Sequence, residues 1–293
     1  MNQSMKLRLS LLILICGCGL AAAPAHGKGR GDKHVIIAQA RQAYYSLSRF
    51  GLIEFQSNIQ PNWEVVLKDE LAANPSAAQE SLRLLNGLHF PIRLDPKGNV
   101  KVDHIADFPP PNERVAAGFK QIYGGMEQAV SGFFETWNLF MLNSPFPEVD
   151  SEYQLEDLGG QYRLSYQEGA ADVVTTMTGD LAITEIKVSA TEFKSSIKPH
   201  FMKTKKGYVL TGYEGNYQPV TGPGATRLNV QLDYQEVNGL QLPRKLHLDG
   251  VYEGRNPFEM ELLFSKYQVK TRARSNEPVV KTLFLNFAEP MRG

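Results

Sequence analysis

Residues 228–248 read LNVQLDYQEVNGLQLPRKLHL, and this stretch decides the fold class of the chain. Apolar side chains, beginning with Leu228 and Val230, alternate with polar ones on both sides of Asn238-Gly239. A period of two is typical of strands that have one buried face and one solvated face. Asn-Gly between two such runs is a strong hairpin signal, because both residues tolerate positive φ angles. The stretch therefore predicts an antiparallel β-hairpin.

The same pattern extends in both directions from this hairpin. Tyr162, Leu164 and Tyr166 alternate in an earlier run, and residues 258–264 alternate in a later one. Consecutive hairpins with this pattern predict an antiparallel meander that has one wet face and one apolar face. We find no internal repeat and no break in composition, so we expect a single domain over residues 34–275, followed by a C-terminal strand or tail over 276–293.

A long amphipathic helix is predicted over residues 112–142, with Asn112 as its N-cap. Large apolar side chains form one stripe along it: Val115, Phe119, Ile122, Met126, Val130, Phe133, Trp137 and Phe140. Burying each of them is worth about 1.5–3 kcal/mol, so the stripe must face the protein interior. We expect it to lie on the apolar face of a curved sheet.

Gly118, Gly125 and Gly132 recur every seven residues along one edge of that stripe. Glycine within a helix costs up to about 1 kcal/mol relative to alanine, so a compensating contact is expected. The simplest hypothesis is that the missing Cβ atoms let the helix backbone approach a strand or a second helix closely.

The apolar stripe has two interpretations, which the sequence leaves open. The first is an ordinary packed core. The second is that part of the stripe lines a cavity for an apolar ligand, because the aromatic area is large for a helix that covers an open sheet. The candidate lining residues are Phe119, Met126, Phe133, Phe134, Trp137 and Phe140.

The N-terminal half contains shorter predicted elements. Residues 34–50 have helical spacing, and we expect Gly51 to end that helix. Residues 52–68 look like one or two strands, and 75–86 like a short helix with Asn74 as its N-cap and Gly87 at its end. Residues 88–104 predict a hairpin around a Pro-Lys-Gly-Asn turn. We interpret about 74–145 as a helix-rich insertion.

The first 25 residues predict a secretory signal peptide, followed by a flexible segment over 26–33. Lys6 and Arg8 precede a short apolar run, and Ala23-Pro24-Ala25 fits a cleavage site. An alternative interpretation is a lipobox, in which Cys18 becomes the acylated N-terminus of a membrane-anchored lipoprotein. Both cysteines of the chain lie in this leader, so the exported domain is expected to have no disulfide.

Composition and motifs argue against several function classes. The 31 basic residues balance the 31 acidic ones without a long basic run, which disfavours nucleic acid as a partner. After the leader, no stretch approaches the length of a transmembrane helix. The histidines are scattered, none has another His, Cys or Glu at metal-binding spacing on one element, and no nucleophile or phosphate-loop motif is present. We therefore expect no metal, no cofactor and no catalytic residues.

Two adjacent stretches, VNGLQLPRKLHLDG at 237–250 and FEMELLFSKYQV at 258–269, resemble the periplasmic lipoprotein-carrier superfamily, which includes the LolA-type sorting proteins. This resemblance implies an α+β fold, in which an unclosed, strongly curved antiparallel half-barrel holds helices in its concave mouth. It also implies a non-enzymatic role in the periplasm, the binding of a lipid, an acyl chain or a lipidated protein. The long insertion departs from that family. The alternative is an envelope interaction module of the same fold with a filled core and a protein partner.

Overall fold

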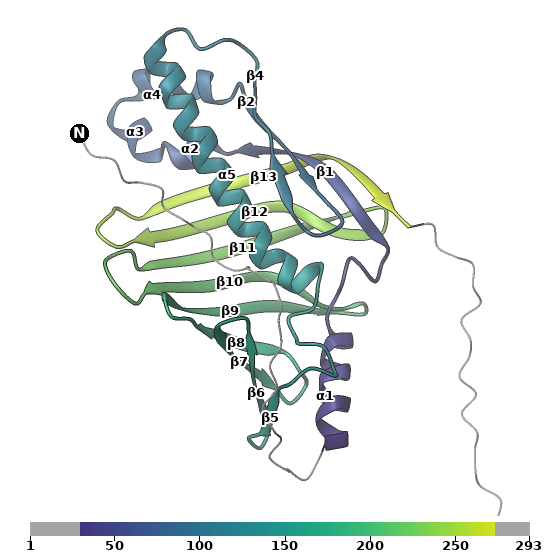
Figure 1. Cartoon of the computed structure of the whole chain (residues 1–293). Helices are drawn as coiled ribbons and strands as arrows, with labels where there is room; N and C mark the ends of the chain where they lie inside the picture. Colours follow the sequence, from purple (N-terminus) through teal and green to yellow (C-terminus); the bar gives the residue numbers. More distant parts are fainter. Residues whose placement is uncertain (1–29, 273–293) are drawn as a thin grey trace, which may run out of the picture.

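A computed structural model describes residues 30–272 of the chain (Figure 1). One antiparallel sheet of 13 strands dominates this part, in the order β3-β2-β1-β13-β12-β11-β10-β9-β8-β7-β6-β5, with β4 beside β2. The sheet is curved like a half-barrel and does not close. The predicted α+β class and the unclosed curved sheet are therefore confirmed. The predicted leader, Cys18 and the predicted tail after residue 275 lie outside the described residues.

The meander runs from β5 to β13, with each strand paired to the next along the chain. Its strands are β5 (Gln154–Asp157), β6 (Gln161–Glu168), β7 (Ala171–Thr178), β8 (Ile183–Ser189), β9 (Phe193–Thr204), β10 (Gly207–Pro219), β11 (Thr226–Val237), β12 (Leu240–Tyr252) and β13 (Phe258–Thr271). Asn238 and Gly239 connect β11 to β12 with φ angles of 52° and 79°, as the predicted Asn-Gly turn requires. In this hairpin Val230 pairs with Leu248 on the apolar face.

The N-terminal strands extend the same sheet beyond β13. β1 (Leu52–Pro61) pairs with β13 on one side and with β2 (Leu88–Leu94) on the other, and β2 continues to β3 (Val100–Val102) and β4 (Ile105–Ala106). The predicted hairpin over 88–104 is confirmed by the β2–β3 pair. β2, β3 and β4 lie within the helix-rich segment 74–145, so this segment also contributes strands to the main sheet.

The end of the predicted strand region, residues 63–68, is helical instead. α2 (Trp63–Val66) and α3 (Lys68–Ala73) follow β1 directly. Asn62 still bonds to β13, since its backbone amide donates to the carbonyl of Glu261 at 2.8 Å. The helix begins at Trp63, which is buried, and α2 packs beside β13. The strand prediction for 63–68 was wrong because these tertiary contacts are absent from the local pattern.

α4 (Pro75–Leu85) confirms the predicted start and, to within one residue, the predicted end, but Gly87 does not play the expected capping role. The Asn74 side chain accepts a hydrogen bond from the amide of Ala77, and Pro75 occupies the first turn. Gly87 does not have a positive φ angle and does not cap the helix. A Cβ at Gly87 would lie 2.4 Å from Cε1 of Phe108, so this glycine makes room for an aromatic ring.

α1 (Arg30–Ala43) begins inside the segment 26–33, of which Arg30 onward is helical rather than flexible, and it ends before the predicted stop at Gly51. Past Ala43 the chain bonds to β10 instead of continuing the helix, since the amide of Tyr45 donates to the carbonyl of Tyr208 at 2.9 Å. The helical spacing of residues 34–50 therefore predicted a helix that extends beyond its observed end at Ala43.

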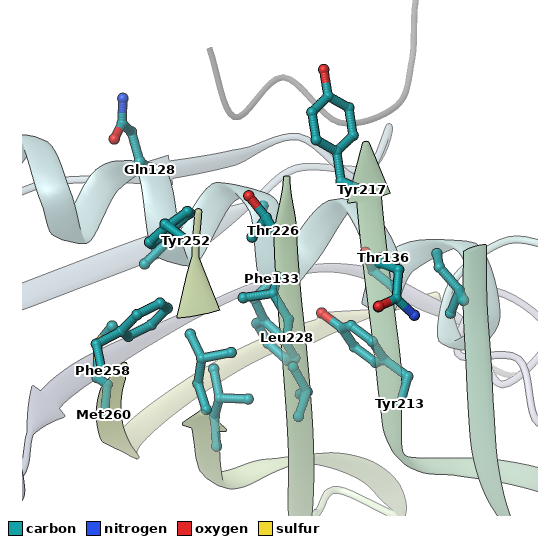
Figure 2. A pocket seen from close by; sticks show the side chains of 18 of the residues that line it. Gln128, Phe133, Thr136, Tyr213, Tyr217, Thr226, Leu228, Tyr252, Phe258 and Met260 are labelled. Atoms are coloured by element: carbon teal, nitrogen blue, oxygen red, sulfur yellow. The ribbon is translucent and has the colours of Figure 1, made fainter. Parts of the chain in front are cut away.

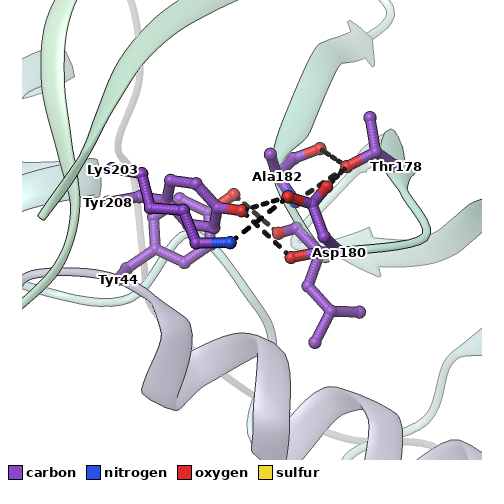
Figure 3. A network of polar contacts seen from close by, with 7 residues as sticks. Tyr44, Thr178, Asp180, Ala182, Lys203 and Tyr208 are labelled. Atoms are coloured by element: carbon purple, nitrogen blue, oxygen red, sulfur yellow. Dashed lines mark hydrogen bonds and ion pairs between the residues drawn. The ribbon is translucent and has the colours of Figure 1, made fainter. Parts of the chain in front are cut away.

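Tyr44, the first residue after α1, is hydrogen-bonded to the turn between β7 and β8 (Figure 3). Its buried hydroxyl donates to the carbonyl of Leu181 at 3.0 Å and accepts from the amide of Ile183 at 2.6 Å. The Tyr44 ring packs on Tyr208 with 5.4 Å between ring centroids. The segment after α1 is thus held by both hydrogen bonds and ring contacts.

Asp180 in the same turn is held as a carboxylate (Figure 3). It accepts hydrogen bonds from the hydroxyls of Thr178 and Tyr208, and Lys203 lies 3.6 Å away. The hydrogen bond from Thr178, then that from Tyr208, stabilises the charged form and lowers the pKa of Asp180 to about 2.

α5 (Glu113–Met141) is the long predicted helix, and it lies across the concave face of the sheet (Figure 1). The Asn112 side chain accepts from the amide of Val115 at 3.0 Å, which confirms the predicted N-cap. Near its C-terminal end Trp137 is fully buried, and its indole Nε1 donates to the hydroxyl of Tyr234 on β11 at 3.1 Å. The apolar stripe therefore packs against the sheet, as predicted.

Candidate ligand-binding cavity

A cavity of about 320 Å³ lies between α5 and strands β9–β13 (Figure 2). α5 contributes Gly125, Gln128, Ala129, Gly132, Phe133 and Thr136. The sheet contributes Ser196, Ile197, Tyr213, Gly215, Asn216, Tyr217, Thr226, Leu228, Val230, Leu246, Leu248, Tyr252, Phe258 and Met260. Most of this lining is apolar or aromatic, and it contains no charged side chain. Its volume lies at the lower end of the range for small-molecule sites.

The helix side of the cavity is made by small residues. Gly125, Ala129 and Gly132 recur at helical spacing and face the space. A Cβ built on Gly125 would meet no heavy atom within 4 Å, and the same holds at Gly118 and Gly124. At Gly118 and Gly125 the predicted close approach of the helix backbone to another element is therefore wrong. The cavity-facing small residues leave the space open instead.

The sheet side is the alternating apolar face of the meander. Leu228 and Val230 on β11, and Leu246 and Leu248 on β12, point inward because residues two apart on a strand share a face. Met260 continues this surface on β13. The strand pattern that predicted the fold thus also supplies one wall of the cavity.

Aromatic rings lie toward the ends of β12 and β13 in this wall. Tyr252 and Phe258 are stacked, with 5.1 Å between ring centroids and 13° between planes. Gly250 makes this arrangement possible, since a Cβ there would lie 2.2 Å from Cζ of Phe258. Gly250 is therefore fixed by close packing, in contrast to the glycines of α5.

Tyr213 is a buried polar group of the lining. Burial raises its pKa to about 12, although a hydrogen bond with Thr136 acts in the opposite direction. The phenol is therefore neutral at physiological pH. It places a hydroxyl at the Thr136 end of the space, among otherwise apolar side chains (Figure 2).

The six residues predicted as lining separate into two groups. Phe133 lines the cavity. Five others are buried but do not belong to the lining: Phe119, Met126, Phe134, Trp137 and Phe140. Phe134 and Trp137 pack on Phe55 of β1, and Phe140 packs on Phe201 of β9. These rings form the core beside the cavity.

Sequence reasoning missed the strand residues and the small residues of the helix. Alternation in the sequence was enough to recognise the inward-facing positions of β11 and β12. It did not show which of these positions α5 would leave free to line a cavity. Gly125, Ala129 and Gly132 were the available indication, because small residues at helical spacing along the edge of an apolar stripe leave space there.

Within residues 30–272, no helix is long and apolar enough to cross a bilayer. Comparisons of the chain with models of known protein families, with curated proteins and with solved structures found no match. The resemblance to the lipoprotein-carrier superfamily therefore stays a prediction.

Proposed function

We propose that this protein binds one elongated apolar molecule, such as a fatty acyl chain, in the cavity beneath α5, and that its role is non-catalytic. The observation that carries the proposal is an open space of about 320 Å³ with a mostly apolar lining, between α5 and the sheet. Apolar side chains that face an unfilled space lose contacts, and a bound apolar molecule would restore them.

The extent of the lining favours a chain over a compact ligand. On the helix it spans Gly125 to Thr136, which corresponds to about 16 Å at 1.5 Å per residue. On the sheet it spans β9 to β13, four strand spacings that amount to about 19 Å. The lining therefore extends along about three turns of the helix and across five strands, and we propose that an elongated ligand follows it.

An acyl chain that fits this cavity could come from two sources, a free lipid or a lipidated protein. A binding assay can separate them, because a free fatty acid would displace a fluorescent fatty-acid probe directly. A lipidated protein would instead form a stable complex that its unacylated form does not form. The alternative function, an interaction module with a filled core, predicts no uptake of the probe in either arm.

Two neighbouring glycines of α5 provide a matched pair for the decisive experiment. Gly125 lines the cavity, whereas Gly124 does not, and both have open space at the Cβ position. We expect Gly125→Leu to fill the cavity and weaken probe binding by about tenfold or more, which corresponds to about 1.4 kcal/mol. Gly124→Leu should bind as the wild type does. Equal binding by both variants, or no binding by the wild type, would contradict the proposal.

We further propose that the protein acts in the periplasm or another exported location, with anchoring through Cys18 as the alternative. The leader supports both, and the apolar cavity suits a carrier of envelope lipids or of a lipidated partner protein. Incorporation of labelled palmitate into the wild type, compared with Cys18→Ala, separates them. Labelling that depends on Cys18 would support the anchored form, and its absence in a cleaved, exported protein would support the periplasmic form.

A further inference from the structure

Three potential metal ligands meet on the face of the sheet opposite to the cavity. His247 and Asp249 lie two residues apart on β12, so they point to the same side. Their neighbours Leu246 and Leu248 line the cavity, which places this pair on the outer face. Glu259 on β13 pairs directly with Asp249, so it joins them across the strands. Their ligand atoms all lie within 4.8 Å of one another.

We propose that His247, Asp249 and Glu259 bind a divalent transition-metal ion, with zinc as the best fit. Nε2 of His247 lies 3.4 Å from Oδ2 of Asp249 and 3.7 Å from Oε1 of Glu259. Tetrahedral zinc, with bonds of about 2.0–2.2 Å to nitrogen and oxygen, separates its ligand atoms by roughly 3.3–3.6 Å. The ion therefore fits with only small side-chain adjustments.

The ligand types select among metals. Imidazole nitrogen together with carboxylate oxygen suits zinc and its neighbours, whereas calcium and magnesium prefer sites made of oxygen alone and take six or more ligands. Three protein ligands leave a fourth tetrahedral position for water. The side chains of His247, Asp249 and Glu259 are 24%, 46% and 29% exposed, so an ion can reach them from solvent.

Neighbouring side chains hold the carboxylates in place. Lys68 pairs with Oε2 of Glu259, which leaves Oε1 directed at His247. The amide nitrogen of Asn229 donates to Oδ2 of Asp249 at 3.3 Å. With Lys68 counted, the two carboxylates give the cluster a net charge of about −1, which favours a cation. Because the ligands come from two adjacent hydrogen-bonded strands, their backbones are already positioned for binding.

Titration of the purified, untagged protein tests the site, with zinc, calcium and magnesium each used alone in isothermal calorimetry. We expect zinc to bind with one-to-one stoichiometry and a dissociation constant near or below about 10 μM, and we expect calcium and magnesium not to bind in that range. His247→Ala and Glu259→Gln should each weaken zinc binding by about tenfold or more, as expected for the loss of one ligand.

His200→Ala is the matched control, since this histidine lies exposed on β9, apart from the cluster. It should leave zinc binding unchanged. Circular dichroism establishes that each variant is folded, and the absorption spectrum of bound cobalt reports whether His247 is a ligand. Undiminished zinc binding in His247→Ala, or no binding by the wild type, would overturn the proposal. Neither outcome depends on whether the cavity holds a ligand.

Discussion

Replacing Gly118, Gly124 and Gly125 with alanine should stabilise the protein. A Cβ at each position would meet no heavy atom within 4 Å, so the change brings no steric cost. Alanine is favoured over glycine in a helix by about 0.8–1.0 kcal/mol per residue. The triple variant should therefore gain up to about 3 kcal/mol, which is a large part of the usual 5–15 kcal/mol stability of a domain. For a protein of this size, this corresponds to a rise in Tm of roughly 6–12 °C.

Urea denaturation, followed by circular dichroism, measures this gain as a higher midpoint with an unchanged slope. Gly212→Ala is the control of opposite sign, because its Cβ would lie 2.3 Å from the carbonyl oxygen of Val230 on the neighbouring strand. We expect Gly212→Ala to lower the free energy of unfolding by about 1–3 kcal/mol, as overpacking does at other sites. An unchanged or lowered midpoint in the triple variant would show that the helix glycines are needed for a close contact, and our reading of them would be refuted.

Three further predictions concern single side chains. Trp137→Phe should lower the free energy of unfolding by about 1–3 kcal/mol in urea denaturation, because the buried hydroxyl of Tyr234 loses its donor; no loss would argue against this hydrogen bond. Asp180 has a pKa of about 2 when folded and about 3.9 when unfolded, so its stabilisation is present above pH 4 and lost as the pH falls toward 2. Asp180→Asn should therefore show a smaller fall in Tm than the wild type between pH 5 and pH 2, and an equal fall would contradict this role. Asn112→Ala should cost about 1 kcal/mol in the same urea assay, since α5 loses its N-cap, whereas Asn112→Asp should cost little.

The sheet was predictable because its determinants are local. Alternation over 228–248 and the Asn238-Gly239 turn specify strands and register without knowledge of the rest of the chain. The N-caps Asn74 and Asn112 are likewise short-range features. By contrast, the helix at Trp63–Val66 depends on contacts with a strand that lies about two hundred residues later. The local sequence pattern does not indicate such long-range contacts.

The candidate site was predictable only in part. Phe133 was found because it lies on the buried stripe of a recognisable helix. The apolar stripe alone could not distinguish Phe133, which lines the cavity, from Trp137, which packs in the core. The two differ in what faces them, since Tyr234 of the sheet lies against Trp137. The cluster around His247 was missed because His247 and Asp249 alone are a common pair on the solvated face of a strand. Its third member, Glu259, is supplied by strand register.

The pairing of β1 with β13 has a consequence for how the chain acquires its structure. Ile59 pairs with Phe264, a partner that is synthesised about two hundred residues later. Until then β1 has only β2 beside it, and its other edge stays unpaired. Closing so long a loop is slow, so we expect folding to await release of the nearly complete chain. A chain truncated before β13 should expose this edge and aggregate.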